Sequence, residues 1–299
     1  MRAEPFRIQQ ILFPIDFSKA SEAAAPHVAG LAQAVGAKVS LMNVVPWLSG
    51  WHGASEPHFV VGDDVLRRLE LSQKEAEASS LKELENFAMQ FFQGIEYDVS
   101  VKTGGVAESI IAHAQEVQAD LVMMSTRGFG PPRPFLIGSV TAKVLHDARC
   151  AVWTSPHPKE LEPFRAYRRI VCAIDYRHPS RELLSHAMEV AQLFKSRLSV
   201  VSAVPCPALG EVPCRDRQSV QSLKRETIDA LRHLFEELKI TPSIHVAEGA
   251  IGEVIRQAAS MEDGDLVVIG RGHLEESWGH LRTHAYEIIW NSPCPVLSL

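Results

Sequence analysis

The chain has 299 residues, of which 46% are hydrophobic and 22% charged, and its formal net charge is −6. That length suits two ordinary domains rather than one, and the composition excludes a disordered chain. The acidic balance argues against nucleic acid as the main partner, because phosphate backbones require a basic face, and no apolar run reaches the roughly 18 residues that a membrane span needs.

The first elements along the chain are an apolar strand and a capped helix. Residues 11–16 (ILFPID) form a short apolar run that is typical of a buried strand. Residues 18–35 follow as a predicted helix, since Ser18 can cap its start and Gly36 stands where a left-handed stop belongs. Pro26 lies inside this segment and predicts a kink or a later start of the helix.

The rest of the first half continues the alternation of strands and helices. Apolar residues recur at helical spacing over residues 63–93, and shorter helices are expected over 106–117 and 139–146. Further apolar, strand-like runs lie at 40–46, 120–124 and 149–153. The order is strand then helix four times, followed by a final strand. This order predicts a parallel sheet with helices on both faces.

The second half repeats the first in the same order. The run ILFPID at 11–16 returns as IVCAID at 170–175, and GGVAESI at 104–110 returns as GAIGEVI at 249–255. Three more blocks match: 40–46 with 199–205, 120–124 with 265–269, and 149–153 with 293–297. Five matched blocks in one order indicate an internal duplication.

A proline-rich segment joins the two halves. Residues 155–167 (SPHPKELEPFRAY) carry three prolines and mixed charges, which suit an extended connector. We therefore expect a first domain over 1–155, a linker over 156–166 and a second domain over 167–299. Each domain is expected to be an α/β, Rossmann-like, open parallel five-stranded sheet, because right-handed crossovers leave few other topologies.

Two segments of the first half are expected to meet where the strand order reverses, which is where ligands bind in such sheets. Asp16 ends the first strand, and its carboxylate suits ribose hydroxyls, a base or a nearby metal; it suits the cap of the following helix equally well. Gly128 and, nine residues later, Gly138 and Ser139 frame the second segment. A helix starting at Ser139 would present free N–H groups to an anion. A turn glycine and an ordinary helix cap would explain the same residues.

Three blocks of the first half resemble the universal stress protein family: ILFPIDFS, DLVMMSTRGFG followed by GSVTAKVL, and CAVW. The second half resembles the same family, so the likeness covers nearly the whole chain. ATP-binding members carry the motif Gly-x2-Gly-x9-Gly-Ser/Thr, and Gly128, Gly138 and Ser139 match it with the correct spacing. The resemblance implies an adenine nucleotide alpha hydrolase-like fold that binds ATP, with Mg²⁺ accompanying the nucleotide.

The resemblance also implies which residues line the site. Those expected to border the adenosine are Pro14, Ile15, Asp16, Val44 and Met124. Those expected to cradle the phosphates are Gly128, Gly138, Ser139 and Val140.

The first half departs from the family motif at two places. Ser125 stands where the first glycine belongs, and a positive φ there would cost about 1–2 kcal/mol, whereas an ordinary φ would leave only crowding by the Cβ atom. Residues 129–134 carry three prolines, which remove backbone donors that would otherwise face phosphate. Arg127 and Arg133 either replace that positive charge or are simply solvated.

The second half departs further. Gly270 and Gly272 begin like the motif, but Arg282 and Thr283 stand where Gly-Ser should open the last helix. We expect this half to be a degenerate copy with a structural or regulatory role. In the family, final strands such as residues 150–153 often pair across domains. This implies an internal pseudo-dimer, with a homodimer of two chains as a further option.

Catalytic motifs are missing from the sequence. It contains no Walker GxxxxGK[ST] loop, no GxGxxG after the first strand, no evident nucleophile–base pair and no clustered set of metal ligands. The leading hypothesis is a stress-response module that binds ATP or a similar adenine nucleotide and couples its occupancy to an unknown protein partner. The alternatives are a scaffold that acts through protein contacts without nucleotide, and a slow ATPase. We expect a cytoplasmic protein, since the start lacks a secretory signal and five cysteines are an odd, sparse set.

Overall fold

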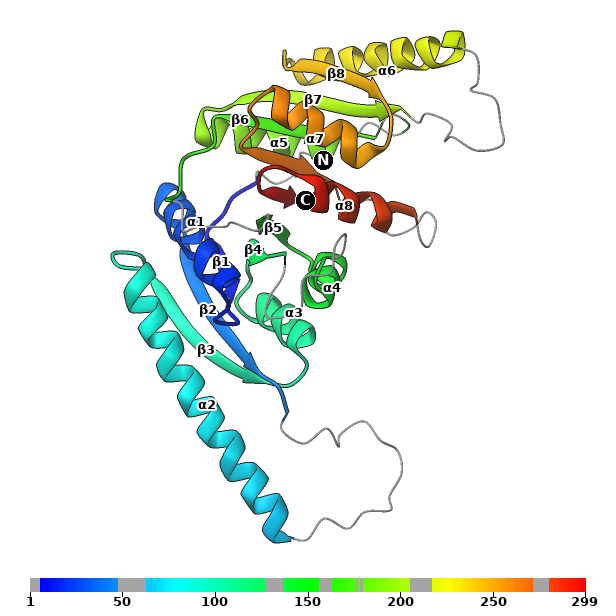
Figure 1. The fold of residues 1–299 in the computed structure, drawn as a ribbon. Helices are drawn as coiled ribbons and strands as arrows, with labels where there is room; N and C mark the ends of the chain where they lie inside the picture. The colour runs from blue at the N-terminus through cyan, green and yellow to red at the C-terminus, as the bar shows by residue number, and fades with distance from the viewer. Residues whose placement is uncertain are drawn as a thin grey trace, which may run out of the picture.

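The computed structural model describes residues 6–47, 63–126, 137–155, 163–175, 177, 180–204, 217–270 and 280–299. Within these ranges the chain folds into two sets of alternating strands and helices, side by side (Figure 1). None of the helices described there is long and apolar enough to cross a membrane.

Both halves follow the predicted order of elements. The first comprises β1 (Gln10–Pro14), α1 (Lys19–Val35), β2 (Lys38–Val45), α2 (Asp63–Phe91), β3 (Tyr97–Thr103), α3 (Val106–Glu116), β4 (Leu121–Ser125), α4 (Ser139–Asp147) and β5 (Ala151–Ser155). The second comprises β6 (Arg169–Ala173), α5 (Arg181–Phe194), β7 (Arg197–Val204), α6 (Arg217–Leu238), β8 (Ser243–Glu248), α7 (Ile251–Met261), β9 (Leu266–Ile269), α8 (His280–Asn291) and β10 (Val296–Ser298). The internal duplication read from the sequence is therefore confirmed.

The strands join into a single sheet rather than two separate ones. Its order is β3-β2-β1-β4-β5-β10-β9-β6-β7-β8, so each half contributes five strands in the same relative order. Pairing is parallel within each half, and only β5 and β10 pair antiparallel, with Leu297 opposite Trp153. The expected pseudo-dimer through the final strands is thus confirmed, and it merges the two predicted five-stranded sheets into one of ten strands.

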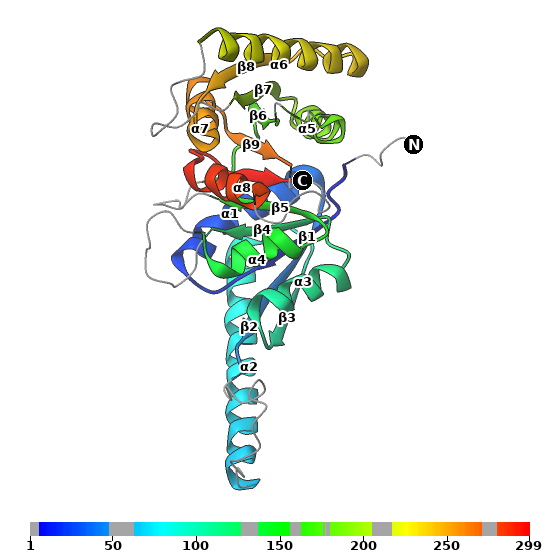
Figure 2. The same cartoon turned by 90° about the vertical axis from the view of Figure 1, so that its right-hand side faces the viewer.

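Helices cover both faces of the sheet, and each face has its own core (Figure 2). Alternate residues of β1 show the division, since Phe13 packs on one side and Leu12 on the other. The core on the first side includes residues of α1, α2, α5 and α6, and that on the second includes residues of α3, α4, α7 and α8. Both cores contain residues from both halves, so hydrophobic packing is continuous across the β5–β10 seam.

Helix α1 has the predicted caps, and it begins before its proline rather than after it. The Ser18 hydroxyl accepts a hydrogen bond from the Ser21 amide at 3.3 Å, and Gly36 ends the helix with φ 71°. A later start at Pro26 was expected as one alternative, and it is wrong, because the helix begins at Lys19. Ala24 and Val28, on either side of Pro26, are buried on the sheet. Their burial offsets the cost of the backbone hydrogen bond that Pro26 cannot donate, so the helix continues through the proline.

The end of the linker packs into the first half at Gly30. A Cβ atom built on Gly30 would lie 2.3 Å from the Cβ atom of Phe164, a distance no real contact tolerates. Phe164 in turn meets the Tyr167 ring edge-on at 5.8 Å. A side chain at position 30 would therefore push the linker off α1.

We expect Gly30→Ala to destabilise the protein by about 1–3 kcal/mol through overpacking, although alanine gains up to about 1 kcal/mol over glycine within a helix. Urea unfolding measures the change. In a Phe164→Gly background the same substitution should become neutral or stabilising, because both the Cβ atom and the ring of residue 164 are gone. An equal loss in both backgrounds would contradict this assignment.

Candidate functional site

The carboxyl ends of β1 and β4 meet in the first half, as predicted. Strand β1 pairs with β2 on one side and with β4 on the other, with Ile11 opposite Leu121. The strand order reverses at β1, and the segments that leave the two strands point to the same edge of the sheet. Asp16 follows β1 and Ser125 ends β4, so both lie at the edge of the sheet where the topology places a ligand crevice.

The Asp16 carboxylate organises the loop that leads into α1. Its Oδ1 atom accepts hydrogen bonds from the Ser18 amide at 3.0 Å, the Ser18 hydroxyl at 2.6 Å and the Ser21 hydroxyl at 2.5 Å. The intervening Phe17 has φ 58°. Of the two roles considered for Asp16, support of the helix start is therefore present. Oδ2 has no hydrogen bond within the described residues, and Asp16 is half-buried.

The backbone next to Asp16 is held from β2. The Ile15 amide donates to the Met42 carbonyl at 2.8 Å, and the Asn43 side chain donates to the Ile15 carbonyl at 2.7 Å. The Ser80 hydroxyl of α2 donates to the side-chain oxygen Oδ1 of Asn43 at 2.7 Å, which fixes the orientation of the side-chain amide. The Ile15 side chain is 3% exposed and belongs to the core. Only its backbone therefore lies at the crevice.

The other residues expected around an adenosine lie at the same strand ends. Pro14 and Val44 are half-buried at the ends of β1 and β2, and Met124 is buried near the end of β4. These side chains supply an apolar wall beside Asp16.

Ser125 does not have the positive φ that was considered for its position in the motif. It is the last residue of β4, and it is not among the described residues with positive φ. The cost of a left-handed serine therefore does not arise. The Ser125 carbonyl accepts a hydrogen bond from the Thr141 hydroxyl at 3.1 Å, which ties the end of β4 to the first turn of α4.

Helix α4 opens at the crevice without a side-chain cap. Gly138 is its N-cap residue with φ −57°, and the Gly138 amide donates to the Thr126 carbonyl at 3.0 Å. Ser139 is exposed and Val140 half-buried, and the described residues contain no acceptor for their amides. A helix start of this kind can accept an anion. Arg127, Gly128 and Arg133 lie outside the described residues.

The same edge of the second half is built differently. The Asp175 Oδ1 atom accepts from the Arg177 amide at 2.8 Å, and the Ser202 hydroxyl takes the place of Asn43 by donating to the Ile174 carbonyl at 2.9 Å. Gly272 and the Arg282 and Thr283 side chains lie outside the described part. Two of the supporting contacts, the backbone amide hydrogen bond to the aspartate and the side-chain hydrogen bond to the preceding carbonyl, are thus kept in both halves.

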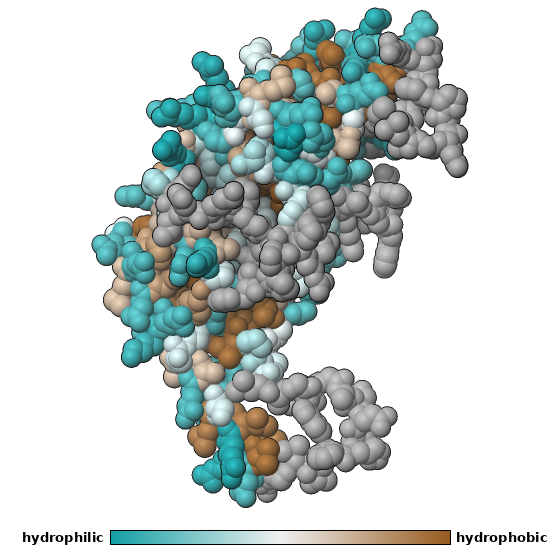
Figure 3. All heavy atoms as spheres, viewed as in Figure 1, coloured by the Kyte–Doolittle hydropathy of each residue, from teal (hydrophilic) through white to brown (hydrophobic). Residues whose placement is uncertain are grey.

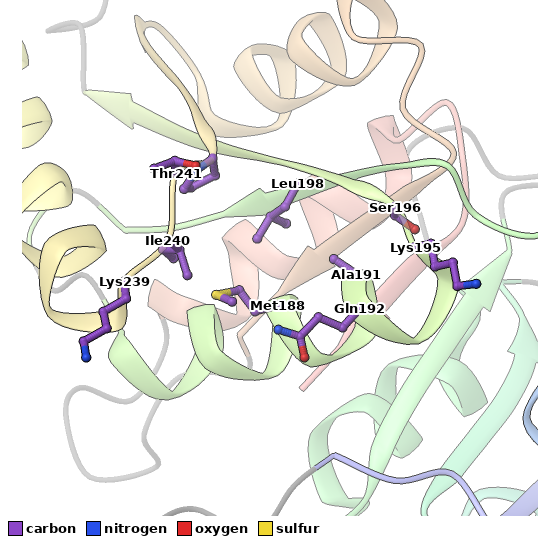
Figure 4. A pocket seen from close by; sticks show the side chains of 10 residues that line it. Met188, Ala191, Gln192, Lys195, Ser196, Leu198, Lys239, Ile240 and Thr241 are labelled. Atoms are coloured by element: carbon purple, nitrogen blue, oxygen red, sulfur yellow. The ribbon is translucent and has the colours of Figure 1, made fainter.

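A shallow hollow of about 570 Å³ lies at the opposite edge of the second half (Figure 4). It is lined by the end of α5, the start of β7 and the turn before β8, with Met188, Leu198 and Ile240 on its floor. Ligands of open parallel sheets bind beyond the carboxyl ends of strands. This hollow faces the amino ends of β7 and β8, so we do not assign it the function of the crevice at Asp16.

A polar cluster around the buried residues Ser40 and His113 was not foreseen from the sequence. The Ser40 hydroxyl donates to Asp98 Oδ1 at 2.6 Å and lies 3.3 Å from His113 Nε2, and His113 Nδ1 lies 2.9 Å from Glu116 Oε2. Lys102 contacts the same Glu116 oxygen at 2.8 Å. Hydrogen bonds from Lys102 and then His113 lower the pKa of Glu116 to about 2.

The order serine, histidine and carboxylate resembles that of a catalytic triad, but its environment is not that of a nucleophile. Ser40 is 0% exposed and His113 5% exposed. The Ser40 hydroxyl proton is directed to Asp98 rather than to a base that would remove it. The cluster is therefore structural, and it ties α3 to β2 and β3.

Comparison with known proteins identifies the family. The model of the universal stress protein family matches residues 7–156 and again 166–299. The universal stress protein MJ0531 of Methanocaldococcus jannaschii is 28% identical over 153 residues, which are 51% of this chain and 84% of the relative. A universal stress protein of Thermus aquaticus is 32% identical over 143 residues, covering 48% of this chain and 94% of the relative.

Solved structures agree on the fold over the whole length. A universal stress protein from Archaeoglobus fulgidus has a TM-score of 0.61 at 19% identity, covering 98% of this chain and 97% of its own. A functionally unknown protein, PA1789 from Pseudomonas aeruginosa, gives the same TM-score at 20% identity and covers 98% of this chain and 92% of its own. With two family matches in tandem on a duplicated α/β fold, the chain belongs to the universal stress protein family.

Proposed function

We propose that the first half binds one adenine nucleotide, with Mg²⁺ accompanying its phosphates, at the carboxyl ends of β1 and β4. The observation that carries this proposal is the start of α4. The amides of Ser139 and Val140 have no described acceptor and open onto the crevice that Asp16 borders. A helix start favours anions, and an uncapped glycine lets phosphate approach closely.

The described residues fit the parts of a nucleotide. Gly138, Ser139 and Val140 would hold the phosphates, together with Arg127 and Gly128. Pro14, Val44 and Met124, with the Ile15 backbone, would border the adenosine. The free Asp16 Oδ2 atom is an oxygen of the type that ribose hydroxyls and hydrated Mg²⁺ contact.

We further propose that the chain acts as a regulatory module rather than as an efficient enzyme, and that only its first half is loaded. Arg282 and Thr283 replace the Gly-Ser pair in the second half, and the serine–histidine cluster is too buried to reach a substrate. The expected stoichiometry is one nucleotide per chain.

Calorimetric titration of the full chain with MgATP tests the site. Saturable binding is expected, and Gly138→Asp should weaken it at least about tenfold, because a carboxylate at the helix start repels phosphate. Aspartate is a favoured N-cap residue, so the fold should not suffer. Ala250→Asp is the matched control, since it makes the same kind of change at the N-cap of α7 in the second half. No saturable binding below millimolar ATP would end the proposal.

A scaffold that works without nucleotide is the second candidate. It is favoured by Asp16 Oδ1, which already accepts three hydrogen bonds from its own helix start and needs no ligand to satisfy it. In that case the chain should bind no ATP. Adding nucleotide should then leave the thermal stability of both the wild type and Gly138→Asp unchanged.

A further inference from the structure

Helix α2 is longer than the strands beneath it. It has 29 residues, and at a rise of about 1.5 Å per residue it spans about 43 Å. Strands β2 and β3 have 8 and 7 residues, and at about 3.3 Å per residue they span about 25 Å. The first turns of α2 therefore extend past the sheet, as Figures 1 and 2 show. We call residues 64–76 the overhang.

The overhang carries one part of an apolar stripe of α2, with no sheet beneath it. Further along α2, the stripe packs into the core through Leu84 and Phe87. At helical spacing upstream it consists of Val65, Leu66 and Leu69, of which Val65 is 49% and Leu66 47% exposed. Figure 3 shows hydrophobic atoms at this end of the molecule, with hydrophilic atoms between them. Between the two parts of the stripe stand Ser72, Gln73, Ala76 and Ser80, so the exposed apolar group is separate from the core. Apolar side chains exposed together beyond the body of a protein mark a contact surface.

We propose that the overhang binds the overhang of a second copy of this chain as an antiparallel helix pair. This inference is independent of nucleotide binding. The overhang is complementary to itself, which favours a second copy of the chain as its partner. Arg68 and Glu75 are exposed, form no ion pair within the described residues, and lie seven residues apart on one flank of the stripe.

An antiparallel pair brings these opposite charges together twice. With a twofold axis between residues 70 and 71, the flanking side chain of Arg68 comes within reach of Glu75 of the partner subunit, and Glu75 within reach of the partner's Arg68. The same register places Val65 opposite Ala76 of the partner subunit and Leu69 opposite the partner's Ser72. Parallel pairing in register would instead direct Arg68 toward Gln73 of the partner subunit, which carries no charge. The antiparallel arrangement is therefore favoured.

The contact is small, which sets its expected strength. A few apolar side chains from each copy bury less than the roughly 1,200 Å² of stable specific complexes. We therefore expect a reversible dimer that dissociates at about 10 µM to about 1 mM.

Sedimentation equilibrium of the full chain tests this pairing by charge reversal. Arg68→Glu and Glu75→Arg should each weaken self-association about tenfold or more, because each creates two like-charge contacts across the axis. An equimolar mixture of the two variants should form a heterodimer, since one chain is acidic at both positions and the other basic. The double variant R68E/E75R should restore the original dimer.

Arg67→Glu is the matched control. It makes the same change of charge one residue away on the side of the helix that faces away from the stripe, and it should leave the dissociation constant within about twofold. The proposal is overturned if the chain stays monomeric up to about 1 mM, if R67E weakens the dimer as much as R68E, or if the double variant fails to restore it.

Discussion

Trp153→Ala is expected to remove about 3–5 kcal/mol from the free energy of unfolding, the usual cost of deleting a large buried aromatic side chain. Trp153 is 1% exposed and lies on β5, opposite Leu297 across the antiparallel seam. Its indole N–H donates to the Tyr167 hydroxyl at 2.9 Å, and His27 lies against its ring at 5.9 Å. The substitution therefore opens a cavity where the first half, the linker end and the second half meet.

Urea unfolding followed by far-UV circular dichroism measures this loss. Tyr167→Phe is the companion variant, because it removes the acceptor of the indole N–H and keeps the ring. Burial raises the pKa of Tyr167 well above its usual value, so the hydroxyl is neutral throughout the experiment. We expect Tyr167→Phe to cost about 1–3 kcal/mol, the penalty of a buried donor without a partner. If Trp153→Ala lost less than about 1.5 kcal/mol, the seam would not be a packed core.

The architecture was largely predictable because its signals are local. The duplicated blocks include four of the five strands of each half in their order, and Ser18 and Gly36 marked both ends of α1. The pairing of β5 with β10 followed from the family resemblance, not from the residues themselves, since an apolar strand does not specify its neighbour.

Other features were hidden because they depend on the relation between distant elements. The periodicity of residues 63–93 showed a stripe along the whole helix, but it contained no information about where the sheet beneath would end. For this reason it did not show that Val65 and Leu66 are about half exposed. The length of the neighbouring strands, not the pattern of the helix, decides burial at that point.

At the candidate site the sequence identified the segments but not their local chemistry. It placed Asp16 and Gly138 at one crevice, which the pairing of β1 with β4 supports. It left open whether Asp16 supports a helix start, and it left open the φ of Ser125, because backbone angles of a strand end depend on tertiary contacts. The hydrogen bonds of Asp16 and the extended backbone of Ser125 answer both questions.

His113 is expected to be the most sensitive polar residue of the first half. It is buried between Ser40, 73 residues away in sequence, and Glu116 on its own helix. His113→Ala should cost about 2–4 kcal/mol, because it leaves a cavity and removes the hydrogen-bond partner on the α3 side of Ser40. His233→Ala is the control, since the His233 side chain is 75% exposed, and it should change stability by less than about 0.5 kcal/mol.

The pH dependence of unfolding distinguishes loss of this hydrogen-bond network from simple loss of volume. Lys102 and His113 lower the pKa of Glu116 to about 2 in the folded chain. Because the unfolded pKa is higher, near about 4.3, ionised Glu116 stabilises the fold above that value. This contribution disappears as the pH falls from about 4.3 through about 2. In His113→Ala only Lys102 still holds Glu116, so stability should fall less steeply across this interval than in the wild type. If the free energy of unfolding falls equally steeply with decreasing pH in both proteins, His113 contributes only packing. If it falls less steeply in His113→Ala, His113 belongs to the charged network that joins α3 to the sheet.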